Sequence, residues 1–148
     1  MSVLLETSLG DLVLDLFVDK CPKTCQNFLK LCEMKYYNNC IFFDVQKDYL
    51  VQTGDPEATG QGGNSIFGVV SGDPQKRYFE DEIVKGIKVK RKGLVGMSNN
   101  GPNQNGSAFF ITLTDNELEN LYKKHTIFGQ IAEGLEVLDK INKTYCDP

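Results

Sequence analysis

The sequence predicts an all-β fold with two capping helices, formed by a single domain. Short apolar runs with strand-like alternation recur along the chain, Gly-rich turns separate them, and only two stretches show the apolar spacing of a helix. At least seven short strands with two helices favour a closed β-barrel whose ends are plugged by the helices.

The chain opens with a predicted β-hairpin. Residues 3–7 form the first expected strand, and residues 8–11 form a turn around a glycine. Residues 12–17 then alternate with the two-residue period of a second strand. Two strands joined by so short a turn pair with each other as antiparallel neighbours.

Two helices are expected, one after the hairpin and one near the C-terminus. Pro22 suits the first turn of the first helix, because its missing N–H needs no partner there. Apolar side chains then recur along one side of that helix, at Cys25, Phe28, Leu29 and Cys32. A second stripe predicts the later helix, at Val137, Leu138 and Ile141.

The remaining strands are expected between these helices, at residues 42–45, 49–53, 94–97, 109–113 and 126–131. No internal repeat or low-complexity linker interrupts them. We therefore expect one domain spanning residues 1–148.

Composition excludes several classes of function. The net charge of −4 gives the chain as a whole no electrostatic attraction for nucleic acid. Five cysteines without a Cys-x-x-Cys pair, and a single histidine, His125, argue against a disulfide scaffold and a zinc site. We expect reduced thiols, and neither a metal nor a cofactor. The N-terminus has no signal peptide, and no apolar run approaches a membrane span, so we expect a soluble intracellular protein, nuclear or cytoplasmic.

Five segments, in this order and spacing, resemble the cyclophilin-type peptidyl-prolyl cis-trans isomerases. They are PKTCQNF at 22–28, QTGD with GQGGNSIFG at 52–68, FEDE at 79–82, MSNNGPNQNGSAFFIT at 97–112 and HTIFG at 125–129. The similarity covers nearly the whole chain. Within it, residues 3–7 and 38–54 are most similar to the cyclophilins fused to an RNA-recognition domain.

The resemblance implies an eight-stranded barrel capped by two helices, with a groove for proline-containing peptides on one outer face. It also implies a monomer without cofactors, contacting RNA only through a domain that this sequence does not contain. Family members continue into a last strand that pairs with the first, but no strand follows Ile141 before the chain stops at Pro148. We therefore expect that the last strand is missing because a longer natural chain has been truncated.

The residue expected to matter most is Asp44. Rotation about an X–Pro bond breaks amide resonance and leaves a lone pair on the nitrogen, which a hydrogen-bond donor stabilises. The resemblance implies an arginine as that donor, eight residues before Gln52, and Asp44 occupies this position. A carboxylate only accepts hydrogen bonds, so it cannot stabilise a lone pair. We expect isomerisation to be weak.

The remaining site residues also follow from the resemblance. It implies catalytic contacts from Gln52, Tyr49 and His125, and substrate contacts from Leu50, Ser98, Asn99, Asn100, Ala108, Phe110, Asn120 and Leu121. Ala108 replaces a glutamine of the groove. Asn120 replaces a tryptophan that helps to bind cyclosporin, so we expect weak cyclosporin binding or none.

Less specific interpretations stay open at this point. Gln52 could satisfy only its own strand, and Phe110 could belong to the barrel core. For the whole chain, three functions remain: a weak isomerase, a catalytically silent proline-peptide-binding module of a larger nuclear RNA-associated protein, and a scaffold with a vestigial groove.

Overall fold

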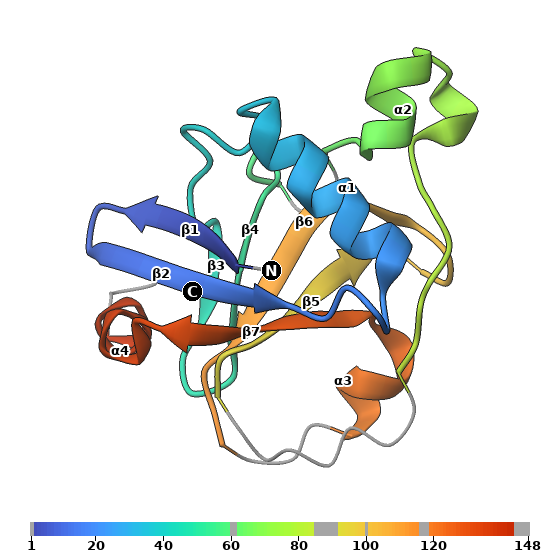
Figure 1. The fold of residues 1–148 in the computed structure, drawn as a ribbon. Helices are drawn as coiled ribbons and strands as arrows, with labels where there is room; N and C mark the ends of the chain where they lie inside the picture. Colours follow the sequence, from blue (N-terminus) through green and yellow to red (C-terminus); the bar gives the residue numbers. More distant parts are fainter. Residues whose placement is uncertain (1, 60–61, 85–91, 100, 116–118, 144–148) are drawn as a thin grey trace.

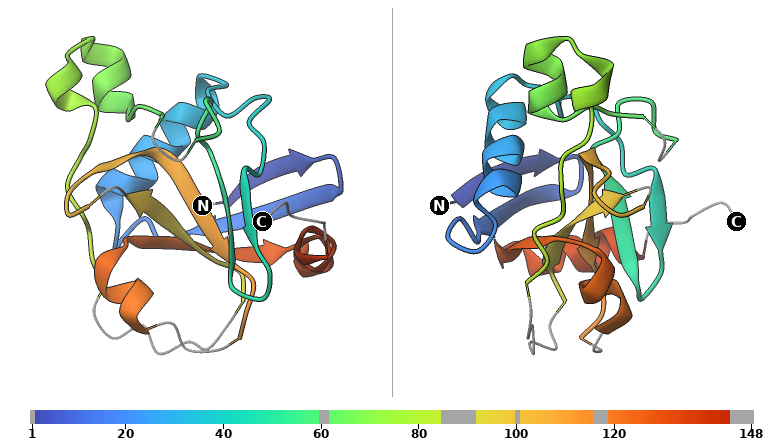
Figure 2. Two further views of the ribbon diagram at one scale, coloured as in Figure 1. Left: turned by 180° about the vertical axis from the view of Figure 1, so that it is seen from behind. Right: turned by 90° about the vertical axis from the view of Figure 1, so that its right-hand side faces the viewer.

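A curled antiparallel sheet forms the body of the protein (Figures 1 and 2). The computed structural model describes residues 2–59, 62–84, 92–99, 101–115 and 119–143. Within these residues seven strands pair in the order β1-β2-β7-β5-β6-β4-β3. They are β1 (Ser2–Thr7), β2 (Gly10–Leu16), β3 (Asp44–Gln46), β4 (Leu50–Thr53), β5 (Leu94–Asn99), β6 (Asn105–Thr112) and β7 (Ile127–Glu133). The predicted β-rich fold is confirmed.

Two of the helices are those predicted, and they cover different parts of the sheet. α1 (Pro22–Glu33) lies across the sheet in Figure 1, and α4 (Leu135–Asn142) packs against β2 and β3. The structure adds α2 (Ile66–Ser71), a 3₁₀ turn (Pro74–Lys76) and α3 (Glu119–Lys124). Each of these is too short to show a helical period, which is why the sequence pattern did not reveal them. No described helix is long and apolar enough to cross a membrane.

The strands differ from their predicted bounds by one to four residues, and two of them show why. β3 starts at Asp44, although the apolar run predicted residues 42–45. β6 starts at Asn105, although residues 109–113 were predicted, because its first half is made of small and polar residues that are nevertheless buried. Residues that are neither apolar nor alternating leave no strand signal in the sequence.

The interior is centred on an aromatic cluster under α1. Phe28 of α1 meets Phe109 edge to face at 5.3 Å between ring centroids, and it also contacts Tyr37 and Phe128. Phe28 is fully buried and Phe109 is 2% exposed. Edge-to-face pairs of this kind add stability beyond the burial of their surface. The apolar side of α1 therefore closes the barrel interior, as its sequence predicted.

The first turn of α1 is held by a carboxylate from a distant segment. The side chain of Cys21, at the helix start, makes no capping hydrogen bond. Instead, the Glu82 carboxylate accepts from the backbone N–H of Lys23 and, at 2.6 Å, from that of Thr24. Negative charge at a helix N-terminus is favourable, since the free N–H groups and the helix dipole are positive there. Glu82 thus ties the FEDE motif to α1.

A buried asparagine joins three elements at the other end of the sheet. Asn27 of α1 is fully buried, and its Nδ2 donates to the Gly106 carbonyl of β6 at 3.1 Å. Its Oδ1 accepts from the backbone N–H of Ile66, the first residue of α2, at 2.7 Å. The segment after α2 returns to the sheet through an isolated bridge between Phe79 and Asn105. We call residues 66–79, fixed at both ends in this way, the α2 arm.

The cysteines in the described part of the chain are free thiols. Two of them, Cys21 and Cys25, are buried beside α1. Burial, reinforced by the nearby Glu82 carboxylate, raises the pKa of Cys21 to about 12 and that of Cys25 to about 11. Both side chains therefore act as small apolar groups at neutral pH.

Candidate functional site

A row of paired residues crosses the outer face of the sheet and brings predicted site residues together. Asp44 of β3 pairs with Gln52 of β4, and Gln52 pairs with Phe110 of β6. Phe110 in turn pairs with Gly96 of β5, which pairs with Ile127 of β7. Directly paired residues point to the same face of a sheet. We call these five residues the outer-face row.

The polar end of the outer-face row is a chain of hydrogen bonds. Nε2 of Gln52 donates to Oδ2 of Asp44 at 2.7 Å, and Oγ of Ser98 donates to Oε1 of Gln52 at 3.0 Å. Nε2 of Gln46 donates to the same Oδ2 of Asp44 at 2.7 Å. The half-buried carboxylate thus turns the Gln52 amide so that its N–H faces β3 and its oxygen faces β5.

The charge on Asp44 has no cationic partner among the described residues. The two amide groups that donate to its Oδ2 are neutral. Arg77 donates through Nε to the Gly63 carbonyl and stacks on Tyr78, and Arg91 lies outside the described residues. No described arginine therefore supplies, near Asp44, the hydrogen-bond donor that a carboxylate cannot provide.

The apolar part of the row is built around Phe110. A Cβ added at Gly96 would lie only 2.4 Å from Cζ of Phe110, so the absent side chain is what lets the ring lie over β5. This ring belongs to a cluster separate from the barrel core, whose buried members are Leu50, Leu94, Phe110, Tyr122 and Ile127, with Leu121 and Phe17 packed against it. Leu50, Phe110 and Leu121, three of the residues predicted to contact substrate, therefore lie together.

This apolar cluster is nearly closed. Phe110 exposes 2% of its surface and Leu50 exposes 5%. The edge of the Phe110 ring meets the His125 ring at a centroid distance of 5.4 Å and an angle of 87°. The face of the Phe110 ring can therefore be reached from outside only after a neighbouring side chain such as Leu121 or His125 turns aside.

Two further residues sit where β5 meets the end of α3. Nδ1 of His125 lies 2.9 Å from the Met97 carbonyl oxygen, which only accepts, so Nδ1 carries a proton. Nε2 of a neutral ring is then the acceptor. Nδ2 of Asn99 donates to the Lys124 carbonyl at 3.0 Å. These contacts fix His125 and Asn99 at the border of the outer-face row.

Not every predicted site residue joins this group. Tyr49 is 38% exposed and stands outside the apolar cluster, while Ala108 is nearly buried on β6, two residues before Phe110. Asn100 lies outside the described residues, and for Asn120 only its backbone position in α3 is described. Gln46 and Gly96 were missed, although Gln46 stands two residues after Asp44 and thus on its face of β3.

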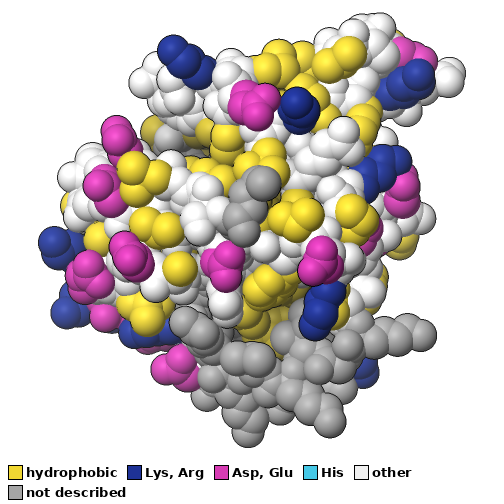
Figure 3. Space-filling view, in the orientation of Figure 1, with side chains coloured by type: hydrophobic (Ala, Val, Ile, Leu, Met, Phe, Trp, Pro, Cys, Tyr) yellow, Lys and Arg dark blue, Asp and Glu magenta, His cyan; other side chains and the backbone are white. Residues whose placement is uncertain are grey.

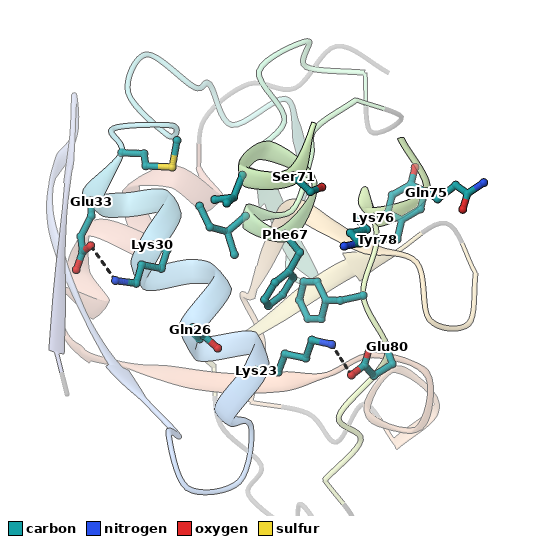
Figure 4. A pocket seen from close by; sticks show the side chains of 14 residues that line it. Lys23, Gln26, Lys30, Glu33, Phe67, Ser71, Gln75, Lys76, Tyr78 and Glu80 are labelled. Carbon is teal, nitrogen blue, oxygen red and sulfur yellow. Dashed lines mark hydrogen bonds and ion pairs between the residues drawn. The ribbon is translucent and has the colours of Figure 1, made fainter. Parts of the chain in front are cut away.

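A separate hollow of about 840 Å³ lies away from the outer-face row, between α1 and the α2 arm (Figure 4). None of the predicted site residues lines it. An ion pair between Lys23 and Glu80 at 2.7 Å spans one end, and the Lys23 ammonium lies 5.0 Å from the centre of the Phe67 ring. Figure 3 shows apolar side chains gathered over α2 and the upper part of α1, on a face where no histidine is visible.

Comparison with known proteins decides the family. The sequence profile described as "Cyclophilin type peptidyl-prolyl cis-trans isomerase/CLD" matches residues 2–148. The chain belongs to the cyclophilin family. A cyclophilin crystal structure from Cryptosporidium parvum is 40% identical, with a TM-score of 0.88, and the match covers 99% of this chain and 86% of that one. A second crystal structure of the same protein was determined in the presence of the dipeptide Ala-Pro.

Curated cyclophilins with similar sequences differ in length. Peptidyl-prolyl cis-trans isomerase CYP59 of Arabidopsis thaliana is 55% identical over the whole chain, which spans 29% of that protein. Peptidyl-prolyl cis-trans isomerase-like 4 of Homo sapiens is 53% identical over 99% of the chain, which spans 30% of it. Human peptidyl-prolyl cis-trans isomerase-like 3 is 48% identical over 97% of the chain, and 83% of that protein is covered. The chain thus spans about a third or less of the first two relatives and most of the third.

Proposed function

We propose that this chain, as a single domain, binds proline-containing segments of proteins across the outer-face row and isomerises their X–Pro bonds slowly. Membership of the cyclophilin family supports the reaction class, and the Ala-Pro dipeptide used with a related structure supports the ligand class. The observation that carries the proposal is the 2.7 Å contact between Gln52 and Asp44, which puts an anion beside the residue expected to touch substrate.

The chemistry of the reaction explains why this contact matters. As the X–Pro bond rotates, the nitrogen lone pair leaves amide resonance, and a donor aimed at the nitrogen lowers the barrier. Asp44 offers only acceptors at this place, and it also engages one N–H of Gln52. Loss of one preorganised donor typically costs about 3 kcal/mol, or about two to three orders of magnitude in rate.

The arrangement still supports peptide binding. Phe110 offers an aromatic ring for the proline, Leu50 and Leu121 flank it, and His125 borders it. Apolar clusters with a few fixed polar groups are typical of ligand sites. Since the cluster is nearly closed, part of the binding free energy is spent on turning a side chain aside, which favours weak binding of short peptides.

The test is a catalysed isomerisation assay on a chromogenic X–Pro peptide. We expect the parent chain to be slow and Asp44→Arg to raise the rate by about ten-fold or more, since it restores a donor. Glu33→Arg is the matched control, because it makes the same charge change at an exposed position of α1 and should leave the rate unchanged. A fast parent chain, or no gain from Asp44→Arg, would contradict the proposed role of Asp44.

A catalytically silent peptide-binding module is the second candidate. The carboxylate at position 44 favours it, as does the greater length of two relatives, of which this chain spans 29% and 30%. An NMR titration with a proline peptide separates the two: shifts of Gln52, Phe110 and His125 signals without any catalysed exchange would favour the module. Association with RNA in the nucleus through another domain stays a prediction. So does weak or absent cyclosporin binding.

A further inference from the structure

We propose that the Asp44 carboxylate makes this site select proline segments that carry a lysine or arginine close to the proline. This inference rests on the proposed peptide binding at the outer-face row, and it names the kind of segment bound there. It makes Asp44 a specificity-determining residue.

The first step is the unbalanced charge of Asp44. Its Oδ2 accepts from Gln46 and Gln52, both at 2.7 Å, so the side chain is held in one orientation. Those two donors are neutral, and no described lysine or arginine pairs with this carboxylate. A half-buried anion without a partner cation attracts a cation from a ligand more strongly than a freely hydrated one does.

The second step is the distance from Asp44 to the proline position. Asp44 and Phe110 flank Gln52 in the outer-face row, two strand spacings apart. Two spacings amount to roughly 10 Å. An extended peptide advances about 3.3–3.6 Å per residue. A long basic side chain on a residue next to the proline, or one residue further, therefore reaches Asp44 while the proline lies over Phe110.

The third step concerns Gln46 and Gln52 when a cation arrives. Both amides donate to Oδ2 only, and no hydrogen bond to Oδ1 is found among the described residues. A guanidinium or ammonium group can therefore approach through Oδ1 without displacing either amide. The site would gain a charge-assisted hydrogen bond and keep its existing network.

The experiment is an NMR titration of the chain with acetylated and amidated tetrapeptides. Two series of peptides are used. In the first series the residue before proline is lysine, glutamine or glutamate, and in the second series the residue after proline is varied in the same way. We expect at least one series to bind in the order lysine, glutamine, glutamate. The affinities of the lysine and glutamate peptides should each differ by about two- to five-fold from that of the glutamine peptide, which is the range of a solvent-accessible ion pair. The difference should shrink at high salt.

Variants assign the preference to Asp44. Asp44→Asn keeps the size and one acceptor but removes the charge, and we expect it to bind the three peptides of a series equally. Glu33→Gln, which removes the same charge from an exposed site on α1, should keep the order seen in the parent chain. A parent chain that binds the glutamine peptide but does not discriminate lysine from glutamate would overturn this inference alone. So would a lysine preference that survives in Asp44→Asn. If no peptide binds, the proposed function fails and this inference fails with it.

Discussion

Two adjacent phenylalanines on β6 show how differently the two faces of one strand are used. Phe109 points inward to Phe28 and Tyr37, and Phe110 points outward to His125. Each exposes only 2% of its surface. Burial alone therefore does not separate a core residue from a candidate site residue in this barrel. What separates them is the packing on each face: Phe109 packs with Phe28 and Tyr37 in the main core, whereas Phe110 packs in a second, smaller cluster and pairs with Gln52 of the outer-face row.

Truncating each phenylalanine is the strongest test of this comparison. We expect Phe109→Ala to lower the free energy of unfolding by about 3–5 kcal/mol, because it empties the aromatic cluster. Phe110→Ala should lower the free energy of unfolding less, since Phe110 belongs to a smaller cluster than the main core, but it should abolish peptide binding. Urea unfolding and peptide titration measure the two effects. If Phe110→Ala were as destabilising as Phe109→Ala and left peptide affinity intact, Phe110 would be a core residue.

Gly96→Ala sharpens the comparison by disturbing only the outer face. The new methyl group would lie 2.4 Å from Phe110 and 2.8 Å from Ile127, so the Phe110 ring must move. We expect a loss of about 1–3 kcal/mol in the free energy of unfolding, as for other overpacked sites, together with a loss of peptide affinity. Gly106→Ala is the control, because its Cβ would meet nothing closer than 3.5 Å. Equal effects of the two substitutions would argue against close packing of Phe110 on β5.

Ser98→Ala tests the polar end of the outer-face row. It removes the hydroxyl that donates to Oε1 of Gln52 at 3.0 Å. We expect a loss of about 0.5–1.5 kcal/mol in the free energy of unfolding, the usual net value of one hydrogen bond. The side-chain amide signals of Gln52 should shift in the NMR spectrum, since one end of that amide becomes free. Unchanged Gln52 signals would mean that this hydrogen bond does not orient the amide in solution.

The effect expected on the inner face depends on pH and is absent at neutral pH. The pKa of Cys21 is raised from 9.0 to about 12 by burial, so the folded chain keeps a proton that the unfolded chain loses. The free energy of unfolding should therefore fall as pH rises from 9.0 toward 12, with no effect of this thiol below 9.0. Cys21→Ala should make the fall less steep in urea unfolding measured across that range. Parallel pH profiles for the two chains would contradict the raised pKa.

Sequence patterns predicted most of the inner face, because its apolar side chains recur with the period of a strand or of a helix. The hairpin, α1, α4 and most strands follow from alternation or helical spacing. The first half of β6 was not predicted. Small and polar residues such as Asn105 and Ser107 are buried there because they form hydrogen bonds, which leave no pattern in the sequence.

The candidate site was predicted differently, through its resemblance to a family. The motifs pointed to Asp44, Gln52 and Phe110, and the register of β3, β4 and β6 brings these three into one row. The orientation of the Gln52 amide could not be predicted, because it depends on donors and acceptors from three strands. The near closure of the Phe110 cluster could not be predicted either, because it depends on how side chains from β4, β7 and α3 pack around the Phe110 ring.

The buried side chain of Asn27 has a consequence for how this domain tolerates change. The α2 arm is attached to the barrel at one end by the Asn27 amide and at the other by the bridge between Phe79 and Asn105. An insertion between these anchors would lengthen the arm and a deletion would shorten it. Neither change would alter the pairing of a strand. The arm is thus a place where the outline of the molecule can diversify while the outer-face row stays as it is.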